Sequence, residues 1–132
     1  MVNKRIKQPK LETSISKNPK IEIPLFSFKY LEKTSFDECN DVKFFIQFLE
    51  HLKKLGNLGW NEIRKSHRHS FGTEKIPIEQ IKVSIPNFIT PDVKHLTVFR
   101  ANGSNNVFVG HQEEHIFHII FIESSFGDIY NH

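Results

Sequence analysis

The last third of the chain contains three apolar runs, separated by turn residues, at positions 96–100, 106–110 and 116–122. Val, Ile and Phe dominate these runs, and such residues favour β-strands. The segment between the first two runs carries Gly103 among asparagines, which suits a hairpin turn, although an anion-binding nest would use the same residues. We expect the runs to form an antiparallel ribbon and the third strand to be a central strand of the sheet, because both faces of that strand are apolar.

Strict alternation along the third strand assigns its side chains to two faces. One face is predicted to carry Ile116, His118, Ile120 and Ile122, and the other His115, Phe117, Ile119, Phe121 and Glu123. On this pattern His118 is expected to be a hydrogen-bonded core histidine. His115 is expected to be exposed, because it lies beside two glutamates near the start of the strand.

The middle of the chain has the pattern of two helices. An alternating run over residues 25–30 first predicts a strand, and Asp41 can then cap a helix. Apolar residues follow at three- and four-residue spacing, which predicts one buried helix face: Val42, Phe45, Phe48 or Leu49, Leu52 and Leu55. Gly56 is expected to end this helix, with basic residues in its last turn. A second helix is predicted over residues 60–68, and the short joint between the two makes a helical hairpin.

Prolines at positions 77, 86 and 91 exclude long helices from residues 73–95. We expect short strand-like pieces there, with residues 80–84 forming either an edge strand or an ordered loop. The predicted fold is therefore α+β, with a helical hairpin on one face of a small antiparallel sheet and the element order β-α-α-β-β-β. Residues 1–24 are expected to be a basic, extended or partly disordered leader, and residues 25–132 a single domain.

Composition and charge narrow the class of protein. The chain has 132 residues, a net charge of +3 and a single cysteine, so no internal disulfide can form. No apolar run is long enough to cross a bilayer, and the N-terminus lacks a secretory signal, so a soluble, cytoplasmic protein without membrane contact is expected. The Lys-rich leader can attract nucleic-acid phosphates, or it can simply be a solvated segment.

The candidate catalytic chemistry involves Arg100 on the first ribbon strand and the pair Tyr130 and His132 beyond the last one. Arginine offers a planar fork for phosphoryl oxygens, histidine exchanges protons near neutral pH, and tyrosine can orient a reacting oxygen. These groups suit metal-free RNA cleavage if the last residues are held against the domain. Alternatively, Tyr130 covers the sheet edge, Arg100 pairs with a surface carboxylate and His132 is frayed.

A basic cluster follows the second helix. It comprises Arg64, Lys65, His67 and Arg68, and it could contact an RNA backbone or simply complement the helix dipole. The chain contains eight histidines, but none has the spacing of a specific zinc motif. We therefore expect neither a metal nor another cofactor.

Over residues 25–132 the chain resembles the RelE/ParE superfamily of bacterial toxins. The resemblance lies in the element order, the amphipathic first helix, Arg100 before the hairpin and the Tyr-x-His ending at Tyr130 and His132. By position, Arg100 corresponds to the family's phosphate-contacting arginine and the ending to its C-terminal catalytic side chains. Val109-Gly110-His111 replaces the usual second basic residue, so His111 would take its place.

The resemblance implies a diverged RelE-like toxin that acts as a metal-independent RNA endonuclease. Such a protein would belong to a toxin–antitoxin or phage-defence system, with RNA or the ribosome and a cognate antitoxin as partners. Two alternatives remain open. The same fold can serve as a non-catalytic protein-binding module, or the chain can be a ParE-like inhibitor of DNA gyrase.

Overall fold

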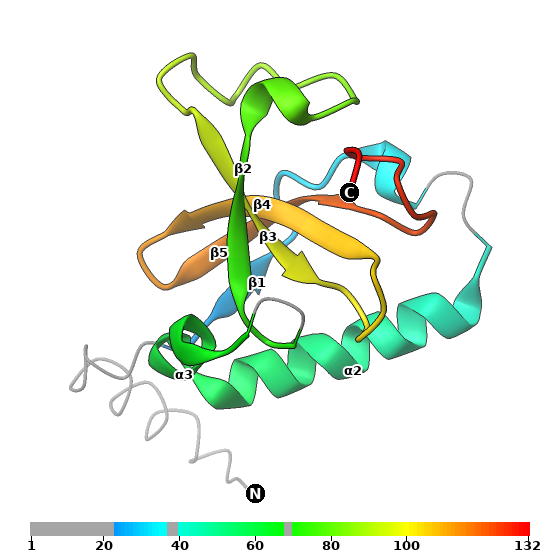
Figure 1. Ribbon diagram of the computed structural model, residues 1–132, viewed down its shortest axis with the longest axis vertical. Helices are drawn as coiled ribbons and strands as arrows, with labels where there is room; N and C mark the ends of the chain where they lie inside the picture. Colours follow the sequence, from blue (N-terminus) through cyan, green and yellow to red (C-terminus); the bar gives the residue numbers. More distant parts are fainter. Residues whose placement is uncertain (1–22, 37–39, 68–69) are drawn as a thin grey trace, which may run out of the picture.

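The computed structural model describes residues 23–36, 40–67 and 70–132 (Figure 1). The predicted leader therefore lies outside the described residues, apart from its last two positions. The elements are β1 (Leu25–Ser27), α2 (Val42–Leu58), α3 (Trp60–Lys65), β2 (Thr73–Pro77), β3 (His95–Arg100), β4 (Val107–Glu113) and β5 (Ile116–Ile122), with 3-10 turns at Lys33–Ser35 and Ile78–Gln80. Neither α2 nor α3, the helices of the described part, is long and apolar enough to cross a membrane.

The sheet has five strands in the order β1-β5-β4-β3-β2. The predicted α+β class is confirmed, and β5 lies inside the sheet as expected. The predicted count of four strands is wrong, because β2 forms an additional edge strand along β3. Pro77 is the last residue of β2, at the sheet edge, where a residue without an N–H is tolerated. The sheet is also mixed, since β1 pairs in parallel with β5 while the other pairs are antiparallel.

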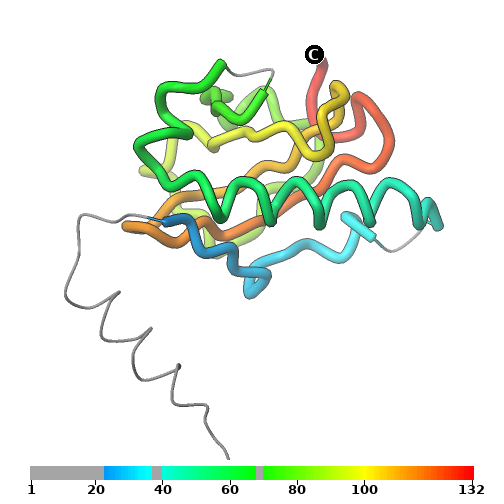
Figure 2. Tube along the Cα trace, turned by 90° about the horizontal axis from the view of Figure 1, so that it is seen from below, coloured from blue at the N-terminus to red at the C-terminus, as the bar shows by residue number. Residues whose placement is uncertain are grey.

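Helix α2 runs along one face of the sheet (Figure 2). Asp41 caps it as predicted, and its Oδ1 accepts a hydrogen bond from the backbone N–H of Phe44 at 3.0 Å. The buried face is rotated from the predicted one. It consists of Phe44, Phe48, His51, Leu52 and Leu55, whereas Val42 and Leu49 are 69% and 61% exposed.

Both helix ends differ from the prediction. Helix α2 continues through Gly56 to Leu58, and Gly59, at φ 82°, makes the joint that only glycine adopts easily. The basic residues expected in its last turn therefore lie farther inside the helix. Helix α3 stops at Lys65, three residues before the predicted end, because Ser66 is already extended.

The two faces of the sheet carry different cores. On the α2 side the core is rich in phenylalanine, and the rings of Phe99 and Phe108 stack with centroids 4.9 Å apart. Phe117 meets Phe99 edge to face, also at 4.9 Å. On the other face, the segments after β2 and after β5 cover an aliphatic core that includes Ile81, Ile129 and Tyr130. Irregular segments, rather than a helix, therefore form the layer that covers this face.

A β-bulge in β5 overturns the strict alternation predicted for that strand. Gly110 pairs with Ile119 and Val109 pairs with Phe121, so Ile120 has no residue opposite. Phe121 consequently joins Ile120 in the aliphatic core, while Ile122 joins the α2 side. A Cβ at Gly110 would collide with the carbonyl oxygen of His118, so the close approach of the strands here requires glycine.

His51 makes the fold sensitive to acid. It is buried in α2 against the ring of Phe71, and its Nε2 has no hydrogen-bond partner in the described part of the chain. Burial lowers the pKa of His51, and the nearby charge of Lys54 lowers it further. The folded state therefore binds fewer protons than the unfolded chain, and stability falls as the pH drops below the ordinary histidine pKa of 6.5.

We predict that His51→Leu flattens the loss of stability between about pH 7.5 and pH 5, where an ordinary histidine gains its proton. The measurement is the free energy of unfolding from urea titrations at several pH values. His95→Gln, at an exposed position, serves as the control and should leave the pH profile unchanged. An unaltered profile in His51→Leu would show that another group sets the acid sensitivity.

Candidate functional site

The structure brings three of the four candidate catalytic residues to one pocket of about 310 Å³. Its lining consists of Glu74, Arg100, Asn105, Phe126, Tyr130, Asn131 and His132. Tyr130 is 7% exposed, and the side chain of His132 is 13% exposed although its backbone is open to solvent. The segment after β5 therefore lies on the body of the domain and forms part of the pocket wall.

Two strands supply the charged side of this pocket. Arg100 ends β3 and is 6% exposed, and its Nη1 donates a hydrogen bond to the carbonyl oxygen of Asn105 in the following turn at 3.1 Å. Glu74 lies on β2 opposite Val98, two residues before Arg100. Because side chains alternate along a strand, Glu74 and Arg100 share the sheet face that points away from α2. A carboxylate and a guanidinium thus lie in the same pocket at one end of this face.

His132 is held by a buried carboxylate. Its Nε2 lies 2.9 Å and 3.0 Å from the two carboxylate oxygens of Glu123, which is fully buried. The imidazole also packs against the rings of Phe126 and Tyr130, with centroids 4.2 Å and 4.3 Å away. A proton on Nε2 donates to Glu123, which leaves Nδ1 as the nitrogen that can exchange a proton with a substrate.

Glu123 is held in turn by the backbone of the C-terminal segment. The N–H groups of Gly127 and Ile129 donate to its Oε2 at 3.0 Å and 3.4 Å. The side-chain amide of Asn106 donates to the carbonyl oxygens of Glu123 and Ser124 at 2.8 Å and 3.1 Å, which joins this segment to the β3–β4 turn. Glu123 therefore organises the loop that carries Tyr130 and His132.

The sequence pattern did not identify Glu123 and Glu74 as residues of the site. The bulge at Ile120 turns Glu123 away from α2 and toward His132, and periodicity alone cannot place such an insertion. One usable signal was the carboxylate that directly follows the apolar run 116–122, since a charge beside a buried strand needs a partner. Glu74 carries no comparable signal, because the short strand-like pieces expected within residues 73–95 were not placed at β2 and the possible edge strand was assigned to residues 80–84.

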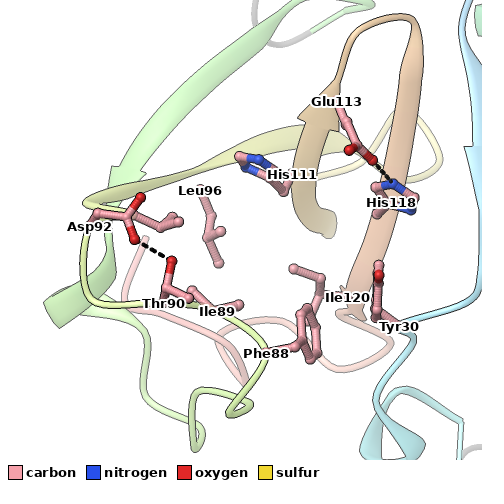
Figure 3. A pocket seen from close by; sticks show the side chains of 11 residues that line it. Tyr30, Phe88, Ile89, Thr90, Asp92, Leu96, His111, Glu113, His118 and Ile120 are labelled. Atoms are coloured by element: carbon pink, nitrogen blue, oxygen red, sulfur yellow. Dashed lines mark hydrogen bonds and ion pairs between the residues drawn. The ribbon is translucent and has the colours of Figure 1, made fainter.

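His111, the fourth candidate catalytic residue, lines a different pocket. Strands β3 and β4 are antiparallel, so Arg100 pairs with Val107, and His111 lies four residues farther along β4. The structure therefore does not place His111 beside Arg100. It lies instead near Asp92 and His118 (Figure 3).

The basic cluster on and after α3 is also separate from the Arg100 pocket. Arg64, Lys65 and His67 are exposed, and Arg68 lies outside the described residues. Arg64 Nη2 donates to Asn61 Oδ1 at 2.6 Å. In Figures 1 and 2, α3 lies beside the C-terminal end of α2, away from the C-terminal segment of the chain.

Two other histidines have structural contacts. His118 is mostly buried, with its Nε2 3.0 Å from Glu113 Oε1 and its ring edge-on to Tyr30. His115 is half-buried rather than exposed, and its carbonyl oxygen accepts a hydrogen bond from the Trp60 indole at 3.0 Å. Within the described ranges, no three His, Cys, Asp or Glu side chains gather as metal ligands do.

Comparison with family models, with curated proteins and with solved structures found no match for this chain. Function is therefore inferred from the chemistry of the pocket itself. Its distinguishing features are a guanidinium, a phenol, an imidazole clamped by a buried carboxylate and a second carboxylate on the adjacent strand.

We predict that Glu123→Ala lowers the free energy of unfolding by about 3 kcal/mol, because it leaves a buried imidazole and two backbone donors without their acceptor. Urea titration measures the change, and limited proteolysis should show earlier cleavage in residues 124–132. Glu113→Ala is the matched control, since it also removes a His–Glu pair but its carboxylate is 70% exposed. A loss below about 1 kcal/mol is expected there. Equal losses in the two variants would contradict the role given to Glu123.

Proposed function

We propose that this chain is a metal-independent RNA endonuclease, a diverged RelE-like toxin of a toxin–antitoxin or phage-defence system. The observation that carries the proposal is the convergence of Arg100, Tyr130 and His132, from separate parts of the chain, on one pocket. Each of these side chains matches a requirement of phosphodiester cleavage. The resemblance to RelE-like toxins predicts the same three residues by position.

RNA cleavage of this kind uses the 2′-hydroxyl as nucleophile. The 2′-oxygen loses its proton and bonds to phosphorus, the bond to the 5′-oxygen breaks, and that oxygen takes up a proton. In this proposal the Glu74 carboxylate accepts the 2′-hydroxyl proton, and the His132 imidazolium supplies a proton to the 5′-oxygen. The Arg100 fork stabilises the charge that builds up on the phosphoryl oxygens, and Tyr130 orients the ribose or the leaving oxygen.

The pair of His132 and Glu123 supports the assignment of His132 as the acid. A carboxylate on Nε2 fixes the orientation of the ring, while Nδ1 remains for proton transfer. The packing of the imidazole against two aromatic rings limits its motion further. Such fixed geometry is what acid–base catalysis requires.

The proposed partners follow from this chemistry. RNA, free or on the ribosome, is the proposed substrate, and a cytoplasmic location and a cognate antitoxin are proposed with it. Arg64, Lys65 and His67 on the α3 side are exposed and separate from the pocket, so they would contact the RNA backbone or the ribosome at a second place.

We predict that Arg100→Lys and His132→Gln each reduce RNA cleavage by about a hundredfold or more, because lysine lacks the planar fork that contacts two phosphoryl oxygens and glutamine cannot transfer a proton. Mapping of RNA 5′-ends and growth after induced expression measure the loss. Melting temperatures close to that of the wild type would show that the variants fold. Lys53→Ala, at an exposed position in α2, is the control and should remain fully active. Wild-type cleavage by both pocket variants would reject the proposal.

The outer face of α2 favours a second candidate function, a protein-binding module. Val42, Ile46 and Leu49 lie at helical spacing and are 69%, 53% and 61% exposed. A stripe of this kind on a solvent-facing helix is typical of a surface that contacts another protein. The stripe is compatible with the nuclease proposal, where the bound protein would be the antitoxin, and also with a chain that only binds.

We predict that Ile46→Glu weakens binding to any protein partner copurified with the chain, because it places a charge in the centre of the stripe. Copurification after coexpression with the neighbouring genes measures this, with Lys43→Glu as an exposed control on the same helix. If the chain leaves RNA intact but still binds its partner through Ile46, the second candidate function is favoured. Undiminished binding by Ile46→Glu would exclude the stripe as the interface.

A further inference from the structure

Figure 3 shows a second pocket, of about 340 Å³. It lies on the same sheet face as the Arg100 pocket, because Leu96, which lines it, and Arg100 lie four residues apart on β3. Its volume is at the lower end of the range for small-molecule sites. Leu96 of β3 and Ile120 of β5 form its apolar interior, and both belong to the aliphatic core on the face opposite α2. Strand β3 also carries Arg100, four residues farther on, so the two pockets are separated by about 13 Å along the strand.

One side of this second pocket is aromatic. The rings of Tyr30 and Phe88 stack with centroids 4.4 Å apart, and Phe88 remains 43% exposed. Figure 3 shows both rings beside Ile120 at one edge of the pocket. A flat heteroaromatic ring would bury apolar area against this side, and exposed aromatic rings are the usual platforms for unpaired nucleobases. A bare ammonium group would instead lose hydration against the apolar interior.

The other sides are polar and carry two carboxylates, together with the imidazole of His111. Asp92 lies across the pocket from Glu113, as Figure 3 shows, and the Thr90 hydroxyl donates to its carboxylate. This hydrogen bond lowers the pKa of Asp92, so its carboxylate is ionised at neutral pH. Glu113 accepts from Nε2 of His118. Two carboxylates repel phosphate but accept hydrogen bonds from amino groups.

We propose that this pocket binds an unpaired nucleobase with an exocyclic amino group, namely adenine, cytosine or guanine, and discriminates against uracil. Uracil presents two carbonyl oxygens and a single N–H, so carboxylates would face its acceptors. The inference rests on the proposed function, since the base would belong to the RNA strand whose phosphate meets Arg100. The pocket would then determine where the RNA is cut, because it binds a base of the RNA strand close to the phosphate that meets Arg100.

The test uses the full chain and free nucleosides, followed by NMR titration of pocket signals. Cytidine against uridine and guanosine against inosine are matched pairs that differ at the amino position. We expect the amino-bearing member of each pair to bind about tenfold more tightly, and the double variant Asp92→Ala/Glu113→Ala to remove this preference. Glu50→Ala/Glu62→Ala, at exposed helix positions, is the control and should keep it.

Several results would overturn the inference. Equal affinity within each pair, no shift of pocket signals at millimolar nucleoside, or preferential binding of butylammonium would each exclude a base-selective site. Arg100→Lys separates this inference from the proposed function, because it should reduce RNA cleavage by about a hundredfold or more and leave nucleoside binding intact. Selective binding by a chain that never cuts RNA would refute the nuclease and preserve the base site. RNA cleavage without nucleoside binding would support the nuclease and refute the base site.

Discussion

The buried carboxylate of Glu123 is the interaction on which the C-terminal part of the structure depends. A carboxylate removed from water is costly unless hydrogen bonds replace its hydration, and Glu123 obtains them from His132 and from two backbone N–H groups. These donors all belong to the segment after β5. Satisfying one buried charge therefore fixes the loop that forms a wall of the Arg100 pocket.

The bulge in β5 is the reason that Glu123 faces this segment at all. Without the extra residue at Ile120, the side chain at position 123 would point toward α2, into a core filled with phenylalanine rings. The bulge is possible where Gly110 lets the strands approach closely. A local irregularity in strand pairing thus decides which side of the sheet receives the carboxylate and, with it, the candidate chemistry.

The two faces of the sheet are covered in different ways. Helix α2 and the stacked phenylalanine rings cover one face with a tightly packed apolar core. The opposite face is covered only by irregular segments, and these leave pockets at both ends of β3. Polar and titratable side chains lie in these pockets because loops place them beside the sheet and leave them accessible to solvent. A packed helix would cover them.

The sequence by itself determined the α+β class, the cap at Asp41, the ribbon of β3, β4 and β5, and the choice of Arg100, Tyr130 and His132 as residues of interest. These follow from local periodicity, capping and side-chain chemistry, which act over a few residues. Tertiary structure decided the fifth strand, the rotated face of α2, the separation of His111 from Arg100 and the clamp on His132. Each depends on strand register and on which distant segment fills a face, and those are set by long-range packing that no local pattern encodes.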